Sequence, residues 1–284
     1  MQNLGYYNGK IGLLEEMSIP MNDRVCWFGD GVYDAGPARN YKIFAIDEHI
    51  DRFFNSARLA QINIPSTKDE LKDLLCELVG KVEAKEHFVY YQCTRGMAPR
   101  SHDYDEDMVG NLWVMIKPQV MPDGTGRIQL RTEEDTRFFH CNIKTLNLMP
   151  SVMSAQQARR EGVFETVYWR PMDNMKRVTE CAHCNVSILK DDKLLTAPID
   201  NLILPGIARA HLIKACHTLG IGVCEEAYDL QEVFDAQEIM VTSSSNLVLF
   251  ADAVDGHLAG GKAPQIAEAI RAEVNREFSE ATAV

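Results

Sequence analysis

The spacing of apolar residues predicts two amphipathic helices in the first part of the chain. One spans residues 47–62, where five apolar side chains recur at helical intervals: Ile50, Phe53, Phe54, Ala57 and Ala60. The other spans residues 64–82, where Thr67 and Glu70 form a capping-box pattern ahead of a leucine-rich stripe. β-like stretches surround both helices, at residues 5–12, 25–36, 87–95 and 111–117. We therefore expect a first α+β domain over residues 1–117.

The pattern breaks at residues 118–126 and then starts again. Prolines, glycines and an aspartate gather there, which is typical of a linker. Beyond it, β-like stretches are predicted at residues 127–133, 162–169, 186–198 and 236–245. Helices are predicted at residues 149–162, 206–220 and 263–278. A second, larger α+β domain is expected over residues 127–284.

Charge and hydropathy restrict the partners of the protein. The formal net charge of −12 argues against a general nucleic-acid-binding protein, because neutralising phosphates needs clustered lysine and arginine. The first residues, MQNLGYYNGK, show no signal-peptide pattern, and no apolar run approaches the roughly 18 residues of a membrane span. We expect a cytoplasmic protein that binds neither nucleic acid nor membranes.

The cysteines raise the question of a metal or redox site. All eight are spread along the chain, and the one close pair is Cys181 and Cys184, with His183 between them. Two thiols at this spacing could form half of a zinc site or a redox pair. A second pair of ligands at a suitable spacing is missing, so the sequence favours no metal site.

Lys144 is the most informative single residue. It lies among the apolar residues Ile143, Leu146, Leu148 and Met149. One reading is a lysine at the edge of a strand, whose aliphatic stem is buried and whose ammonium group reaches water. The other is a lysine buried for chemistry, because desolvation favours the neutral, nucleophilic amine.

Other stretches could bind the phosphate of a cofactor. Gly206, Ile207 and Ala208 open a predicted helix, where free N–H groups and the helix dipole favour an anion. Hydroxyl donors follow a predicted strand at Ser243, Ser244 and Ser245, and Arg52 on the first helix adds a positive charge. A lysine, a phosphate site and an acid such as Glu180 together match what pyridoxal phosphate requires.

With these residues assembled, the chain resembles the class IV, or fold-type IV, pyridoxal-phosphate aminotransferases, and within them the D-amino-acid aminotransferases. The resemblance covers nearly the whole chain. Its motifs are FGDGVYD, HIDRFFNSARL, TRGMAPRSH, IKTLNLMPSV, VTECAHCNV, LLTAPIDNLILPGIAR and VTSSSN. The long class signature is matched by Glu180, Ala182, Asn185, Thr196, Gly206, Ile207 and Arg209. It implies two domains, with the larger C-terminal one barrel-like, flanked by helices and carrying the cofactor.

The resemblance also implies a role for each site residue. Lys144 corresponds to the Schiff-base lysine and Glu180 to the carboxylate that pairs with the pyridine nitrogen of pyridoxal 5′-phosphate. The phosphate-binding positions are Arg52, Ile207, Ala208, Ser243 and Ser244. The substrate-carboxylate trap is Tyr33, Arg100 and His102. Transamination between D-amino acids, such as D-alanine, and 2-oxo acids, such as 2-oxoglutarate, is the implied reaction, in a homodimer whose trap is completed across the interface.

Several departures from the family pattern keep alternatives open. Cys181, Ala182, His183 and Cys184 stand where the family often has Gly-Ser-Ser-Ser, and Asp34 stands where Glu is usual. A branched-chain L-amino-acid aminotransferase or an aminodeoxychorismate lyase shares the same fold. A metal- or redox-sensing protein, or a cofactor-binding protein with little turnover, are the remaining alternatives.

Overall fold

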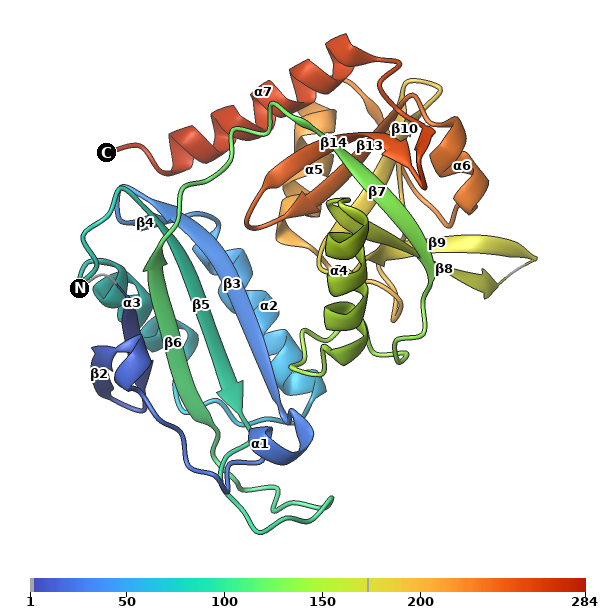
Figure 1. Ribbon diagram of the computed structural model, residues 1–284. Helices are drawn as coiled ribbons and strands as arrows, with labels where there is room; N and C mark the ends of the chain where they lie inside the picture. Colours follow the sequence, from blue (N-terminus) through green and yellow to red (C-terminus); the bar gives the residue numbers. More distant parts are fainter. Residues whose placement is uncertain (1–2, 173) are drawn as a thin grey trace. The chain divides into compact units, whose positions relative to one another are not determined.

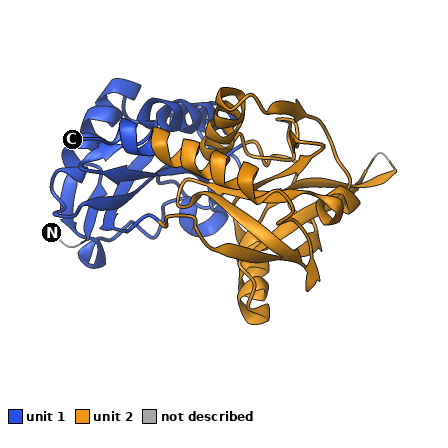
Figure 2. Cartoon of the chain, turned by 90° about the horizontal axis from the view of Figure 1, so that it is seen from above, with its two compact units in different colours: residues 1–121, 143–147, 278–284 blue, residues 122–142, 148–277 orange. Residues whose placement is uncertain are grey.

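The structure is a computed structural model that describes residues 3–172 and 174–284. It divides into two compact units, which Figure 2 distinguishes by colour. Unit 1 holds Met1–Met121, Ile143–Asn147 and Phe278–Val284, and unit 2 holds Pro122–Asn142 and Leu148–Glu277. The ranges predicted from the sequence, 1–117 and 127–284, differ from these units because two later segments pack with the first one.

Unit 1 is built on a six-stranded sheet with the order β2-β1-β6-β5-β3-β4, in which all neighbours are antiparallel. Its strands are β1 (Leu4–Tyr7), β2 (Lys10–Leu13), β3 (Gly31–Arg39), β4 (Lys42–Ile43), β5 (Glu86–Thr94) and β6 (Asn111–Pro118). The central strands β3 and β5 pair along their whole length, from Gly31 opposite Thr94 to Arg39 opposite Glu86. This pairing fixes the position of every side chain that β3 contributes to the site.

Two helices cover one face of this sheet, α2 (Ile46–Leu59) and α3 (Lys68–Val79) (Figure 1). Their apolar stripes are buried, as the predicted periodicity requires. The predicted capping box is confirmed, because the Thr67 hydroxyl accepts the Glu70 N–H and the Glu70 carboxylate accepts the Thr67 N–H.

One predicted strand in unit 1 is wrong at its start. Residues Val25–Phe28 form a single helical turn, α1, after the short 3₁₀ helix η1 (Leu14–Glu16). The Asp23 carboxylate accepts the Val25 N–H, and Gly29 ends the turn with φ of 61°. A local side-chain cap and a left-handed glycine therefore override the apolar run.

Unit 2 contains a nine-stranded mixed sheet with the order β12-β11-β10-β13-β14-β7-β8-β9, and β15 pairs with β14. Its strands are β7 (Arg127–Glu134), β8 (Glu165–Met172), β9 (Met175–Cys181), β10 (Asn185–Lys190), β11 (Lys193–Thr196), β12 (Gly222–Glu225), β13 (Glu238–Ser243), β14 (Leu247–Val254) and β15 (His257–Leu258). Only three residues join β9 to β10, although β9 ends the order and β10 stands third from the other end. The sheet must therefore curl, which confirms the predicted α+β fold with a barrel-like larger domain.

Four helices belong wholly or mainly to unit 2. They are α4 (Met149–Glu161), α5 (Ile207–Thr218), α6 (Leu230–Asp235) and α7 (Pro264–Ala281), of which residues up to Glu277 lie in this unit. The core of unit 2 is formed by sheet residues such as Val167, Ile188 and Val241, with Tyr228 and Val233 beside them. The three helices predicted in this half of the chain are confirmed as α4, α5 and α7.

Candidate active site

Lys144 is placed by a short segment that pairs with the start of β3. Thr145 bridges Val32, the Tyr33 N–H donates to the Lys144 carbonyl at 3.0 Å, and the Leu146 N–H donates to the Gly31 carbonyl at 3.0 Å. The ammonium nitrogen then lies 4.2 Å from the centre of the Tyr33 ring. Lys144 is half-buried and belongs to unit 1, whereas the sequence prediction placed it in the larger domain.

Arg52 lies beneath β3 as part of a buried charge cluster. Its Nε donates to Asp34 Oδ2 at 2.8 Å, and a terminal nitrogen donates to Asp34 Oδ1 at 2.8 Å. His49 Nδ1 lies 2.7 Å from the same Asp34 Oδ1. Burial alone would raise the pKa of Asp34, but Arg52 and His49 hold it well below its ordinary value. The guanidinium is thus fixed in one orientation by a carboxylate of β3.

Arg100 and His102 come together on the ring of Phe28. The Arg100 guanidinium carbon lies 5.2 Å from the centre of that ring, and the His102 ring centre lies 5.2 Å away. Both side chains are exposed. Within residues 3–172 and 174–284, no recorded ring, ion-pair or hydrogen-bond contact joins Tyr33 to either of them. One chain therefore brings together only two of the three predicted trap residues.

A buried arginine that the sequence analysis missed shapes the loop of the trap. Arg24 donates to the Ser101 carbonyl at 2.7 Å and to the His102 and Asp103 carbonyls at 3.2 Å. Its charge is balanced by Asp30, 2.7 Å away. Because three consecutive carbonyls converge on one guanidinium, the loop is held without any secondary structure of its own.

In unit 2, Glu180 lies near the end of β9 and is almost fully buried. Its Oε1 accepts from Arg137 at 2.6 Å, and its Oε2 accepts from the Asn185 amide at 3.0 Å and from the Leu204 N–H at 2.9 Å. Burial raises the pKa of Glu180 above its ordinary value, although Arg137 opposes that shift. A buried carboxylate of this kind favours a further positively charged partner.

Arg137 is the second functional candidate that the sequence analysis missed. It grips Asp135 with two nitrogens, each at 3.0 Å, and gives its third nitrogen to Glu180. Arg170 Nε lies 3.1 Å from Asp135, and the Thr179 hydroxyl donates to the same carboxylate at 3.0 Å. The group closest to Glu180 is thus itself anchored by a buried network.

The N-terminus of α5 is shaped by a glycine. Gly206 is the N-cap residue and has no side-chain cap, and a Cβ at this position would collide with Asn185 Oδ1. The first-turn N–H groups of Ile207 and Ala208 therefore lack the side-chain acceptor that usually caps a helix. Asn185 links this turn to Glu180, because its amide donates both to that carboxylate and to the Leu204 carbonyl.

The serine stretch after β13 forms a turn with hydroxyl groups available. Ser243, Ser244 and Ser245 are half-buried, and the Ser243 hydroxyl lies 3.3 Å from that of Ser245. The neighbouring Thr242 hydroxyl is buried and has no hydrogen-bond partner among the residues that the structure describes. Such an unsatisfied group indicates that the turn has donors left for a ligand.

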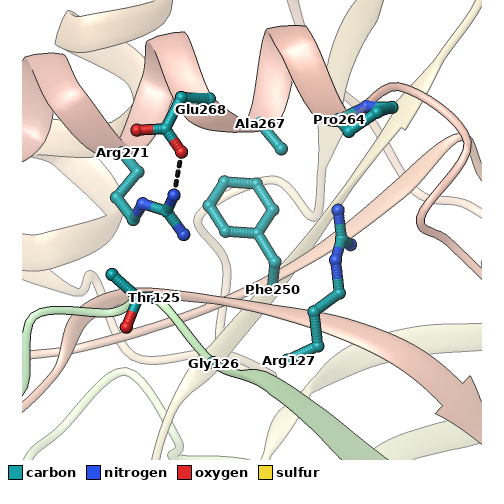
Figure 3. A pocket seen from close by; sticks show the side chains of 8 residues that line it. All are labelled: Thr125, Gly126, Arg127, Phe250, Pro264, Ala267, Glu268 and Arg271. Atoms are coloured by element: carbon teal, nitrogen blue, oxygen red, sulfur yellow. Dashed lines mark hydrogen bonds and ion pairs between the residues drawn. The ribbon is translucent and has the colours of Figure 1, made fainter.

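A hollow of about 200 Å³ lies elsewhere in unit 2 (Figure 3). Arg127 and Phe250 form one side of it, and Glu268 and Arg271 of α7 form another. The two α7 side chains form an ion pair with each other, and Arg127 pairs with Glu238. None of the predicted site residues lines this hollow, so it does not mark the active site.

Comparison with known proteins identifies the family. The model of amino-transferase class IV matches residues 31–254. The chain belongs to the class IV aminotransferases. It is 33% identical over 260 residues to the D-alanine aminotransferase of Bacillus licheniformis, covering 91% of this chain and 90% of the relative. It is 35% identical over 258 residues to that of Listeria monocytogenes serotype 1/2a, covering 87% and 86%.

Solved structures show the same fold at lower sequence identity. The branched-chain aminotransferase of Thermoproteus uzoniensis superposes with a TM-score of 0.86 at 20% identity, covering 98% of this chain and 96% of that one. A branched-chain aminotransferase of T.th. with pyridoxamine 5′-phosphate gives a TM-score of 0.87 at 20% identity, covering 98% and 94%. Class IV aminotransferases depend on pyridoxal 5′-phosphate. No helix in the described part of this aminotransferase is long and apolar enough to cross a membrane.

The residues of this class IV aminotransferase fit that cofactor. The uncapped turn of α5 and the hydroxyls after β13 supply the donors that a phosphate needs. Glu180 supplies a buried carboxylate for a protonated ring nitrogen, and Lys144 supplies an amine. The predicted position of the CAHC stretch on a strand is wrong, since residues 182–184 form the bend between β9 and β10.

Proposed function

We propose that this aminotransferase acts on D-amino acids, such as D-alanine, and passes the amino group to a 2-oxo acid, such as 2-oxoglutarate. The observation that carries the proposal is the pair formed by Arg100 and His102 on Phe28. A guanidinium beside an imidazole suits a planar carboxylate, which the guanidinium can grip with two hydrogen bonds. The D-alanine aminotransferases found among the relatives support this substrate class.

Lys144 is the proposed proton carrier. Pyridoxal phosphate, when bound, supplies an electron-withdrawing ring that stabilises negative charge on the substrate Cα. Lys144 removes the proton from that Cα and later returns a proton to the product side, as a general base and acid. Its backbone is fixed on both sides by β3, which holds the amine at a constant height above Tyr33.

The remaining residues orient the cofactor and tune its charge. Glu180 accepts the N–H of the protonated ring nitrogen and so keeps that nitrogen positive. The N–H groups of Ile207 and Ala208, the hydroxyls of Ser243 and Ser244, and the Arg52 guanidinium are the proposed phosphate ligands. Arg52 uses two nitrogens on Asp34, and its planar fork presents further N–H groups beyond that pair.

We also propose that the active enzyme is a homodimer. Tyr33 lies with Lys144 on β3, whereas Arg100 and His102 lie on an exposed loop. A second chain that brings its own exposed loop to the Tyr33 side would complete the trap. The cytoplasmic location expected from the sequence stays a prediction.

The visible absorption of the purified protein with its cofactor tests the substrate class. We expect D-alanine to convert the cofactor to its pyridoxamine form and L-leucine to leave it unchanged. Conversion by L-leucine alone would contradict the proposal and favour a branched-chain enzyme. A protein that binds the cofactor but responds to no amino acid would contradict turnover.

An arginine variant tests the trap itself. Arg100→Ala should lower kcat/KM for D-alanine by about 10- to 100-fold, since a hydrogen bond to a charged group is worth roughly 1.5–3 kcal/mol. Arg58→Ala is the matched control, because Arg58 is also exposed and its side chain contacts Asn55, away from the trap. Wild-type kinetics in the Arg100 variant would overturn the trap assignment.

A further inference from the structure

Three chemically different side chains meet where β8 begins and β9 turns into β10. They are Glu165, the first residue of β8, and His183 and Cys184 in the 182–184 bend. One ligand atom from each of the three lies within 4.8 Å of the other two. The Glu165 side chain is fully buried, Cys184 is buried, and the His183 side chain is 52% exposed. None of the three has a role in the proposed transamination.

The Glu165 carboxylate is only half satisfied. Its Oε1 accepts the Thr166 N–H at 2.8 Å. Its Oε2 lies 2.6 Å from His183 Nδ1, but this contact is an ion pair and not an aligned hydrogen bond, because Oε2 has no hydrogen-bond partner among the described residues. A buried carboxylate oxygen with unused acceptor capacity is costly unless a cation neutralises it.

We propose that Glu165, His183 and Cys184 bind a divalent metal ion of the zinc type. A thiolate, an imidazole and a carboxylate are the three side chains that zinc accepts, and the soft sulfur disfavours magnesium and calcium. Three protein ligands leave one tetrahedral position open, and the exposed side of His183 gives water access to it. The site would link the start of β8 to the bend that follows Glu180.

The electrostatics of the cluster agree with this assignment. Burial alone would lower the pKa of His183, but the Cys184 and Glu165 side chains raise it to about 11. Burial raises the pKa of the Cys184 thiol, and His183 opposes that shift. The cluster therefore holds positive charge strongly, and a metal ion would take the place of protons. Metal affinity should consequently rise with pH.

The site follows from the substitutions in this chain. The sequence analysis rejected a metal site because Cys181 and Cys184 lacked a second pair of ligands. The structure supplies a different set, in which Glu165 comes from a neighbouring strand and Cys181 does not take part. Neither the cofactor nor its proposed ligands enter the argument, so the site stands or falls independently of the proposed function.

Zinc binding to the holoenzyme tests the proposal. The protein is treated with a chelator, kept loaded with pyridoxal phosphate, and titrated with Zn²⁺ alone by calorimetry. We expect about one zinc ion per chain and an affinity that increases with pH. Cys184→Ser and His183→Ala should each weaken binding by more than the roughly 10- to 100-fold that loss of an outer-shell partner costs.

Matched variants and a second metal guard against misfolding and against metal held by the cofactor. Cys216→Ser removes a buried thiol outside the cluster, and His257→Ala removes an exposed imidazole, so both should bind zinc like the wild type. Co²⁺ bound to the wild-type protein should show a thiolate-to-cobalt absorption band, a readout that needs no variant. Sub-stoichiometric zinc, absence of that band, or unchanged affinity in Cys184→Ser would each overturn the proposal.

Discussion

Each unit of this aminotransferase buries a carboxylate against an arginine, and the two pairs behave in opposite ways. In unit 1, Asp34 receives two nitrogens of Arg52 and a contact from His49, and its pKa falls although burial would raise it. In unit 2, Arg137 gives two nitrogens to Asp135 and only one to Glu180, and burial raises the pKa of Glu180.

The difference lies in how completely each charge is neutralised. Asp34 is saturated by its own unit, so it acts as a fixed anchor for Arg52. Glu180 shares its cation with a second carboxylate, so its charge is incompletely balanced in the protein alone. A positively charged N–H on a bound cofactor ring would complete it. Asp34 is thus a structural carboxylate, and Glu180 is one held ready for a ligand.

The largest expected effect is on stability in unit 1. Asp34→Asn leaves the buried Arg52 without its counter-ion and should lower the free energy of unfolding by about 3–5 kcal/mol. Urea denaturation of the cofactor-free protein measures this, as a lower midpoint with an unchanged slope. Asp51→Asn is the control, since its pair with Lys68 is exposed and worth only about 0–1 kcal/mol. Equal losses in the two variants would remove the distinction.

The next effect is on catalysis in unit 2. Glu180→Gln keeps the shape of the side chain but removes its charge, and should lower kcat by about 100- to 1,000-fold, as expected for loss of one preorganised electrostatic partner. Steady-state kinetics with D-alanine measure this. Glu238→Gln is the control, because Glu238 is equally buried and paired with Arg127 but has no proposed contact with the cofactor. A variant at Glu180 as active as this control would refute its role.

The smallest effect is the pH dependence of stability in the cofactor-free protein. Because the pKa of Asp34 is lowered on folding, its contribution is present above the unfolded value of about 4 and is lost as pH falls below it. Because the pKa of Glu180 is raised, its protonated form stabilises the fold at low pH, and that contribution is lost as pH rises above about 4. Urea midpoints between pH 3 and 7 should change in opposite directions when each residue is replaced by its amide; changes in the same direction would contradict the comparison.

Much of the fold could be predicted from local patterns. The helices α2, α3, α4, α5 and α7 are long enough for their periodicity to show, and the Thr67 cap marks a start. The six-residue helix α6 is too short for a period, and β9 carries several charged residues because backbone pairing with β8 defines it. The pairing of residues 143–147 with β3 could not be predicted, since its partner lies far earlier in the chain.

The same limit separates the site residues that were predicted from those that were missed. Lys144, Glu180 and Gly206 are found because they lie within distinctive local motifs. Arg137 lies in a loop without periodicity, and its partner Glu180 follows only after a helix and a strand. Arg24 resembles an ordinary surface arginine until three carbonyls of a distant loop converge on it. Residues whose function depends on non-local partners leave no trace in a single sequence.

The most direct test of the central claim is the protonation state of the ring nitrogen of the bound cofactor. Pyridoxal phosphate labelled with ¹⁵N in the ring would be bound to the wild-type protein and to Glu180→Gln, and the nitrogen chemical shift recorded at neutral pH. The account predicts a protonated nitrogen in the wild type and an unprotonated one in the variant. An unprotonated nitrogen in the wild type would contradict it, because Glu180 would then not be the carboxylate that keeps the ring positive.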